Sequence, residues 1–137
     1  MDLCDFTTRT FCTFGYCRST VGGYDIWESE TTHILNHIIK CSNICSTSIN
    51  VMNYTAVIEC LSHINNMTEY THEYANMDAR PRVNIVCGCF MVCQQLNKTM
   101  QSNALKSMYL ECEQLVNILY KRVCIKFVYD QYLVPLK

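Results

Sequence analysis

The feature that most constrains the fold is an apolar run from Val83 to Cys93, which reads VNIVCGCFMVC. Asn84 is its only strongly polar residue, so a helix made of these residues would have no wet face. A helix that is apolar on every side is buried on every side. The run falls short of the roughly 18 apolar residues that a membrane-spanning helix needs. It therefore predicts a buried central helix in a globular fold.

The composition predicts one domain spanning residues 1–137. The chain has 137 residues, of which 50% are hydrophobic and 17% are charged, and this argues against disorder. The formal net charge of −1 offers no electrostatic footprint for nucleic acid. We therefore expect no nucleic-acid partner and no integral membrane segment.

The chain holds 11 cysteines, an odd number that leaves one unpaired in a disulfide scaffold. Most stand at helix-periodic apolar positions, where a reduced cysteine acts as a small hydrophobe. The first residues lack the basic and apolar regions of a signal peptide. A reducing cytosol is therefore predicted. A secreted, glycosylated, cysteine-rich helical factor remains the alternative, and it would show about one free thiol by the pairing argument.

Helical periodicity covers most of the chain. Residues 46–48 supply a break and an N-cap. Residues 3–16 favour a strand by propensity, although their aromatic spacing also allows a helix. Residues 123–128 can begin a separate element. We predict helices at about 31–45, 49–64, 68–77, 78–96 and 102–123.

The architecture that follows is all-α, with one buried helix wrapped by amphipathic helices. Asp78 is a suitable N-cap for the central helix. Gly88 inside that helix costs about 1 kcal/mol relative to alanine, and such a glycine marks a close approach by another group.

One pattern suggests metal ligands and fails on geometry. His33, His37, Cys41 and Cys45 are spaced four residues apart. On a helix that rises about 1.5 Å per residue, the outer two lie about 18 Å apart. They cannot share an ion whose ligands lie within about 2.3 Å. We expect no metal and no cofactor.

The sequence also lacks the residue combinations that are typical of enzyme active sites. Cys87, Cys89 and Cys93 lie in its most apolar part, where a thiol is inert. No pair of carboxylates, phosphate loop or nucleophile motif is found. The interpretation is that the chain is not an enzyme.

Arg80 would lie in the first turn of the central helix, where the helix dipole disfavours a cation. It is either an ordinary solvated arginine or a bidentate partner for a carboxylate at the rim of an apolar groove.

Three segments resemble the homology motifs of the Bcl-2 family of apoptosis regulators. CGCFMVCQQLNKTMQ (87–101) is similar to the end of the family's first motif, and MDAR (77–80) stands where its NWGR core is expected. LCDFTTRTFCTFGY (3–16) resembles the N-terminal motif, which implies a helix there. Asp78 and Met77 depart from the NWGR pattern. The chain is similar to a divergent viral member, of a large DNA virus such as a fish iridovirus.

The resemblance implies a Bcl-2-like helical bundle that inhibits apoptosis. It would hold the death-motif helix of host pro-apoptotic proteins (Bim-like or Bak/Bax-like) in a hydrophobic groove. A protein of the same fold that blocks inflammatory signalling is the alternative. The host cytoplasm, mitochondria reached through partners, and a homodimer are further expectations. The implied groove residues are Arg80, Ala79, Val83, Cys87, Met77, Tyr74, Thr71, Tyr70, Met67, Ile34, Leu35 and Ile38.

Overall fold

The structure is a computed structural model. It describes residues 8–18, 21–29, 36–45, 48–99 and 105–134. The elements are β1 (Arg9–Arg18), β2 (Val21–Ser29), β3 (Asn36–Cys45), α2 (Ile49–Asn65), the 3-10 turns η1 (Thr68–Tyr70) and η2 (Met77–Ala79), β4 (Arg82–Cys87), α3 (Phe90–Leu96), α4 (Lys106–Leu119) and β5 (Cys124–Tyr129).

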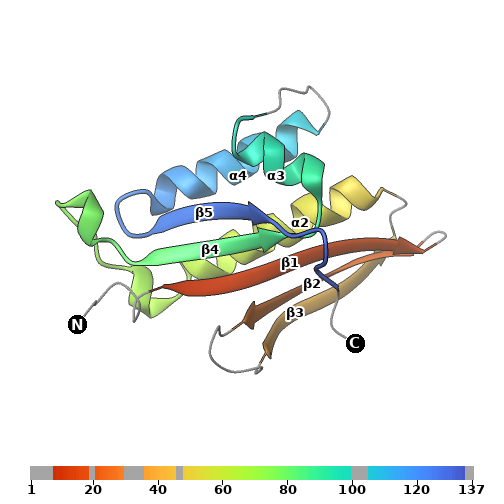
Figure 1. Ribbon diagram of the computed structural model, residues 1–137, viewed down its shortest axis with the longest axis horizontal. Helices are drawn as coiled ribbons and strands as arrows, with labels where there is room; N and C mark the ends of the chain where they lie inside the picture. Colours follow the sequence, from red (N-terminus) through yellow and green to blue (C-terminus); the bar gives the residue numbers. More distant parts are fainter. Residues whose placement is uncertain (1–7, 19–20, 30–35, 46–47, 100–104, 135–137) are drawn as a thin grey trace.

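The fold is mixed α/β, and the all-α prediction is wrong. Five strands form one sheet in the order β3-β2-β1-β4-β5. β1, β2 and β3 pair antiparallel, whereas β1 with β4 and β4 with β5 pair parallel. In Figure 1, α2 crosses behind the sheet, and α4 packs against α2. The chain therefore buries its apolar residues between a sheet and helices.

The predicted helix at 31–45 is wrong over its described part. Residues 36–45 form β3 and pair with β2 along its length, from Ser29↔Asn36 to Val21↔Cys45. This segment reads NHIIKCSNIC, and its three isoleucines suit a strand by propensity. Hydrogen bonding to a neighbouring strand outweighed a helical spacing that rested on few residues.

The predicted central helix at 78–96 is also wrong. Residues 82–87 form β4, in which Val83, Ile85 and Cys87 are buried and the alternate residues are more exposed. The chain then turns at Gly88 and continues as the short helix α3. A strand buried in a parallel sheet can read as a continuous apolar run, just as a buried helix does. The run therefore holds two elements.

Two of the predicted helices are confirmed. α2 begins after Ser48, whose side chain accepts a hydrogen bond from the backbone N–H of Val51 at 3.3 Å, as expected of an N-cap. α4 covers most of the predicted last helix. Beyond it, residues 124–129 form β5, so the separate element foreseen near 123–128 exists. Of the helix predicted at 68–77, only the turn η1 is present.

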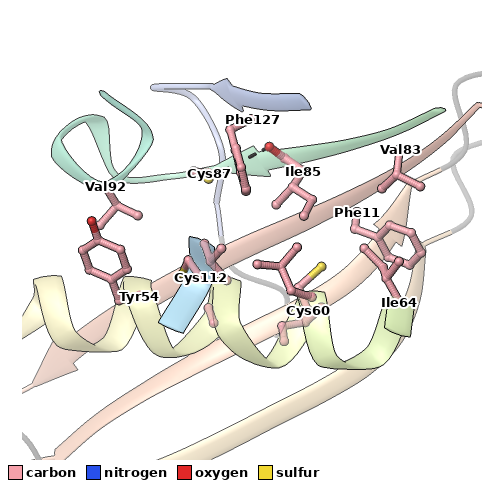
Figure 2. Packing of buried hydrophobic residues seen from close by; sticks show 14 of the residues in the cluster. Phe11, Tyr54, Cys60, Ile64, Val83, Ile85, Cys87, Val92, Cys112 and Phe127 are labelled. Carbon is pink, nitrogen blue, oxygen red and sulfur yellow. Dashed lines mark hydrogen bonds between the residues drawn. The ribbon is translucent and has the colours of Figure 1, made fainter. Parts of the chain in front are cut away.

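The core lies between the sheet and the helices. Figure 2 shows Phe11 of β1, Val83 and Ile85 of β4, and Phe127 of β5 on the side of the strands that faces α2. From α2, Cys60 and Ile64 point back toward them. Cysteines fill core positions as small apolar groups, as expected. None of the helices within the described ranges is both long enough and apolar enough to cross a membrane.

Candidate functional site

The sheet has one place where its topology reverses. β1 continues into β2 on one side, whereas β4 leads through α3 and α4 to β5 on the other. In open α/β sheets, ligands bind outside the carboxyl ends of the strands at such a point. We call this place the switch edge and define it by Phe14, Gly15, Gly88, Cys89 and Asp130.

Gly15 brings β1 into direct contact with the first turns of α2. Its backbone N–H donates to the Asn53 side-chain oxygen at 2.9 Å, and the Asn53 amide donates to the Gly15 carbonyl at 3.4 Å. The same amide also donates to the carbonyl of Ile49 at 2.9 Å. A Cβ on Gly15 would lie 2.3 Å from the backbone nitrogen of Asn53. Asn53 is therefore a structural clamp, and its side-chain amide is already bonded.

Phe14 lies over Gly88 on the face of the sheet away from α2. A Cβ on Gly88 would lie 2.6 Å from Cδ2 of Phe14. The close approach predicted at Gly88 is thus confirmed, although the glycine ends a strand rather than lying within a helix. Next to this pair, the Thr13 hydroxyl donates to the Val86 carbonyl at 3.1 Å. The centre of the switch edge is therefore a phenyl ring.

Two carboxyl groups lie on either side of this ring. Asp25 of β2 pairs directly with Phe14, and Asp130 follows β5, its N–H bonded to the Cys87 carbonyl at 3.1 Å. The Asp130 carboxylate accepts from the N–H of Tyr132 at 2.9 Å, which closes a turn. Burial raises the pKa of Asp25. Burial, and secondly the charge of Asp130, raise the pKa of the Cys12 thiol to about 11.

Asp25→Asn is expected to stabilise the protein at pH 7 and to leave its stability unchanged near pH 3. The folded-state pKa of Asp25 lies above its unfolded value. Below both pKa values the carboxyl is neutral in both states, so its burial as a charge costs no stability. As the pH rises through the unfolded value toward the folded one, the fold must bury a charge and loses stability. Thermal unfolding followed from pH 3 to pH 7 measures this difference. The exposed Asp78→Asn is the control, and an Asp25→Asn protein less stable at pH 7 than wild type would contradict the argument.

Exposed aromatic rings surround the switch edge. Phe90, at the start of α3, is 52% exposed, and Tyr129, at the end of β5, is 36% exposed. Their ring centroids are 5.3 Å apart at 82°, an edge-to-face pair. Tyr132, three residues beyond β5, is 81% exposed. The Phe90–Tyr129 pair offers an exposed aromatic surface of the kind that is enriched at interfaces.

Two exposed cations lie on the same face of the sheet as Phe14. Arg82 of β4 and Lys126 of β5 alternate with the buried residues of their strands and so point away from the helices. Asn84, two residues after Arg82 on β4, pairs with Lys126 on β5. This face therefore runs from a cationic end to the ring of Phe14. Tyr129 has the parity of the buried Phe127, so the Phe90–Tyr129 ring pair lies on the helix side of the sheet.

Arg80 makes its contacts within the chain. Its Nε donates to the Met77 carbonyl at 2.7 Å and its Nη1 to the Tyr120 carbonyl at 2.5 Å. Its guanidinium carbon lies 5.3 Å from the centroid of the Tyr120 ring. Ala79 precedes it in the exposed turn η2. The arginine is a brace between this turn and the end of α4.

The other described members of the implied groove set divide between the core and the surface turns. Val83, Cys87 and Tyr70 are buried in the core. Ile38 lies in β3, whereas Ile34 and Leu35 fall outside the described residues. The remainder lie in or near the turns η1 and η2, namely Met67, Thr71, Tyr74 and Met77.

The cysteine patterns are not metal sites in the described part of the chain. His37, Cys41 and Cys45 belong to a strand, so their four-residue spacing does not align them on a helix, and His33 is not described. Within the described ranges, no three groups of the types that ligate metals cluster together. Cys87 and Cys93 are buried, and Cys89 is partly exposed, with its thiol 3.7 Å from the side-chain oxygen of Asn50. Cys12, Cys60, Cys112 and Cys124 are also free thiols, and the thiols of Cys4, Cys41 and Cys45 lie outside the described side chains.

Comparison with solved structures decides the fold. A ribonuclease H1 from the archaeon Halobacterium salinarum superposes with a TM-score of 0.62 at 13% identity, covering 89% of this chain and 86% of that one. The LC11 ribonuclease H1, solved with an RNA/DNA hybrid, gives 0.67 at 16% identity, with 90% and 86% covered. The chain has the ribonuclease H fold. No protein-family model and no curated protein matches the sequence.

The same fold occurs inside a larger viral protein. A foamy viral protease-reverse transcriptase, solved in complex with an RNA/DNA hybrid, matches with a TM-score of 0.63 at 15% identity. The match covers 98% of this chain but only 19% of that one. The ribonuclease H fold is therefore found both as a separate protein and as one part of a longer chain.

These neighbours correct several expectations. The likeness to Bcl-2 proteins, the anti-apoptotic function and the death-motif partners are wrong, because the fold is that of ribonuclease H. The interpretation that the chain is not an enzyme is overturned by neighbours that are ribonucleases. The exclusion of nucleic acid is overturned by neighbours bound to RNA/DNA hybrids. The inflammatory and secreted alternatives find no support, while the location and the homodimer stay predictions.

Sequence reasoning missed the switch edge because its residues are far apart in the chain. Phe14, Gly88 and Asp130 follow no common spacing. Gly88 was the one signal available, since it indicated a close approach without naming the partner. The register of β1 against β4 supplies that partner, Phe14.

Proposed function

We propose that this chain binds a nucleic-acid strand, alone or in an RNA/DNA hybrid, at the switch edge. The observation that carries the proposal is the exposed Phe90–Tyr129 ring pair, just beyond the carboxyl end of β4 and at the end of the edge strand β5. Aromatic rings bind nucleic acid by stacking on unpaired bases, which suits every base because each has a π-face. Neighbours of the same fold were solved with RNA/DNA hybrids.

Two exposed cations on the opposite face of the sheet supply contacts for a strand that passes over the carboxyl edge. Arg82 and Lys126 are exposed on the sheet face that carries Phe14, and the Phe90–Tyr129 rings lie at the carboxyl edge on the helix side. Cations contact phosphates and set the position of a strand, whereas rings contact its bases. The net charge of −1 means that binding depends on these local contacts rather than on a general positive field.

The Phe90→Ala/Tyr129→Ala double variant is expected to weaken binding at least about tenfold. Removing a ring that stacks on a base costs about 1–3 kcal/mol, and about 1.4 kcal/mol is a factor of ten. Fluorescence anisotropy with labelled RNA/DNA hybrid, single-stranded RNA, single-stranded DNA and duplex DNA, at one fixed ionic strength, measures the affinities.

Tyr120→Ala is the matched control. Tyr120 is 53% exposed, but it follows α4 near the amino ends of β4 and β5. Its removal is expected to leave the affinity within about twofold of wild type, because an exposed substitution away from a contact has little effect. The proposal fails if wild type binds none of the four ligands, or if the double variant binds as tightly as the control.

A further inference from the structure

Nucleases that cleave phosphodiesters commonly use two divalent cations, held about 3.5–4 Å apart by carboxylates. Hard cations such as Mg²⁺ require oxygen ligands in close to octahedral geometry. The ribonuclease H fold therefore raises the question of whether this chain's own residues fit such a pair of cations. The answer lies in the groups that line the switch edge.

The middle of the switch edge holds no carboxylate. Near the carboxyl end of β1, the residue that lies over Gly88 is Phe14. Its ring occupies the space that a side chain on Gly88 would need. Two side-chain oxygens beside it are already bonded, because the Asn53 oxygen accepts from Gly15 and the Thr13 hydroxyl donates to Val86. A phenyl ring, a glycine and a bonded amide offer no ligand set for a hard cation.

The two flanking carboxyl groups are too far apart to share one. Asp25 lies on β2 and Asp130 follows β5, with β1 and β4 between them. Neighbouring strands are about 4.8 Å apart, so the backbone positions of these two residues are three spacings, or about 14 Å, apart. Asp25 is also only 5% exposed, and Asp130 closes the turn with Tyr132. The described residues therefore do not fit a two-cation site at this place.

We propose that the switch edge takes its nucleic-acid strand without a bound divalent cation, with Phe14 packed on Gly88 as a contact surface where carboxylates would be needed to hold one. This inference rests on the proposed function for the identity of the ligand. Its statement about cations does not depend on that ligand and is tested separately.

The test begins with calorimetric titration of Mg²⁺ and Mn²⁺ into the wild-type chain. No saturable heat is expected up to millimolar cation. In addition, exchange of Mg²⁺ for EDTA at matched ionic strength is expected to change the affinity for the RNA/DNA hybrid by less than about twofold, since only screening by salt remains. Saturable cation binding, a more than tenfold dependence of affinity on Mg²⁺, or cation-dependent cleavage of the hybrid would overturn the proposal.

A gain-of-function variant shows whether the missing carboxylates are the reason that the switch edge binds no cation. Phe14→Asp with Gly88→Asp places acids on β1 and β4, one strand spacing apart and beside Asp130. This double variant is expected to bind Mn²⁺ with saturable heat, with folding checked by circular dichroism. A folded double variant that binds no cation would overturn the assignment. If this variant does not fold, the single change Gly88→Asp in a Phe14→Ala background gives the same readout with less crowding.

The two hypotheses fail in different ways. If wild type binds no nucleic acid but also no cation, the proposed function is wrong and the cation inference stands. If it binds nucleic acid only with Mg²⁺, the proposed function stands and the cation inference is wrong.

Discussion

Gly15→Ala is expected to leave the chain largely unfolded under native conditions. The added Cβ would lie 2.3 Å from the nitrogen of Asn53 and 2.5 Å from the carbonyl carbon of Met52, both backbone atoms of α2. Backbone cannot rotate away as a side chain does, so α2 would have to move off the sheet and break the Asn53 clamp. We expect a cost above about 4 kcal/mol, which is exceptional for one substitution and comparable with the whole stability of a small domain.

Urea unfolding followed by tryptophan fluorescence measures this effect, because the single tryptophan, Trp27, is buried. Gly88→Ala is the matched control, since its new Cβ would meet the Phe14 ring rather than backbone. A ring can shift, so about 1–3 kcal/mol is expected there. Combining Gly88→Ala with Phe14→Ala is expected to remove the steric part of that cost, a coupling that a double-mutant cycle isolates. A Gly15→Ala protein within about 1 kcal/mol of wild type, a difference typical of ordinary substitutions, would contradict this account of the β1–α2 contact.

Phe11→Ala is expected to cost about 3–5 kcal/mol of unfolding free energy. Phe11 is 0% exposed at the middle of the sheet, and its ring centroid lies 6.0 Å from that of His63 in an edge-to-face contact with α2. The guanidinium carbon of Arg9 lies 5.5 Å from the centroid of the same ring, and Arg9 Nε donates to Glu28 at 2.6 Å. Removing the ring thus leaves a cavity beneath β1 and takes away a packing surface from this ion pair.

Phe90→Ala, the same change at a half-exposed position, is the comparison. It is expected to alter stability by less than about 0.5 kcal/mol, as surface substitutions usually do. Thermal and urea unfolding of both variants give the two values side by side. Equal losses would show that Phe11 is not the core residue that its burial indicates.

The two longest helices could be predicted from the sequence because their signals are local. The N-cap at Ser48 and the spacing of apolar residues in α2 are properties of a few neighbouring residues, and the structure confirms them. The same holds for α4, and for the separate element seen near residues 123–128. The strand propensity of residues 3–16 was also informative, since residues 9–18 form β1. A resemblance to helical motifs then led away from it.

The apolar run from Val83 to Cys93 was misread because periodicity cannot distinguish a buried strand from a buried helix when both faces are covered. Its two halves adopt different structures on either side of Gly88. Pairing of β4 between β1 and β5 decides the strand, and both partners lie far away in the sequence. The segment at 36–45 failed for the same reason, since only its pairing with β2 makes it a strand.

By itself, then, the sequence determined that the chain has a substantial apolar core, that α2 and α4 are helices, and that something approaches Gly88 closely. Those properties follow from composition and from contacts within a few residues. The sheet order and the switch edge were decided only by the tertiary structure. Phe14, Gly88 and Asp130 meet because parallel strands align their carboxyl ends, and that alignment is set by long-range hydrogen bonds that no local pattern encodes.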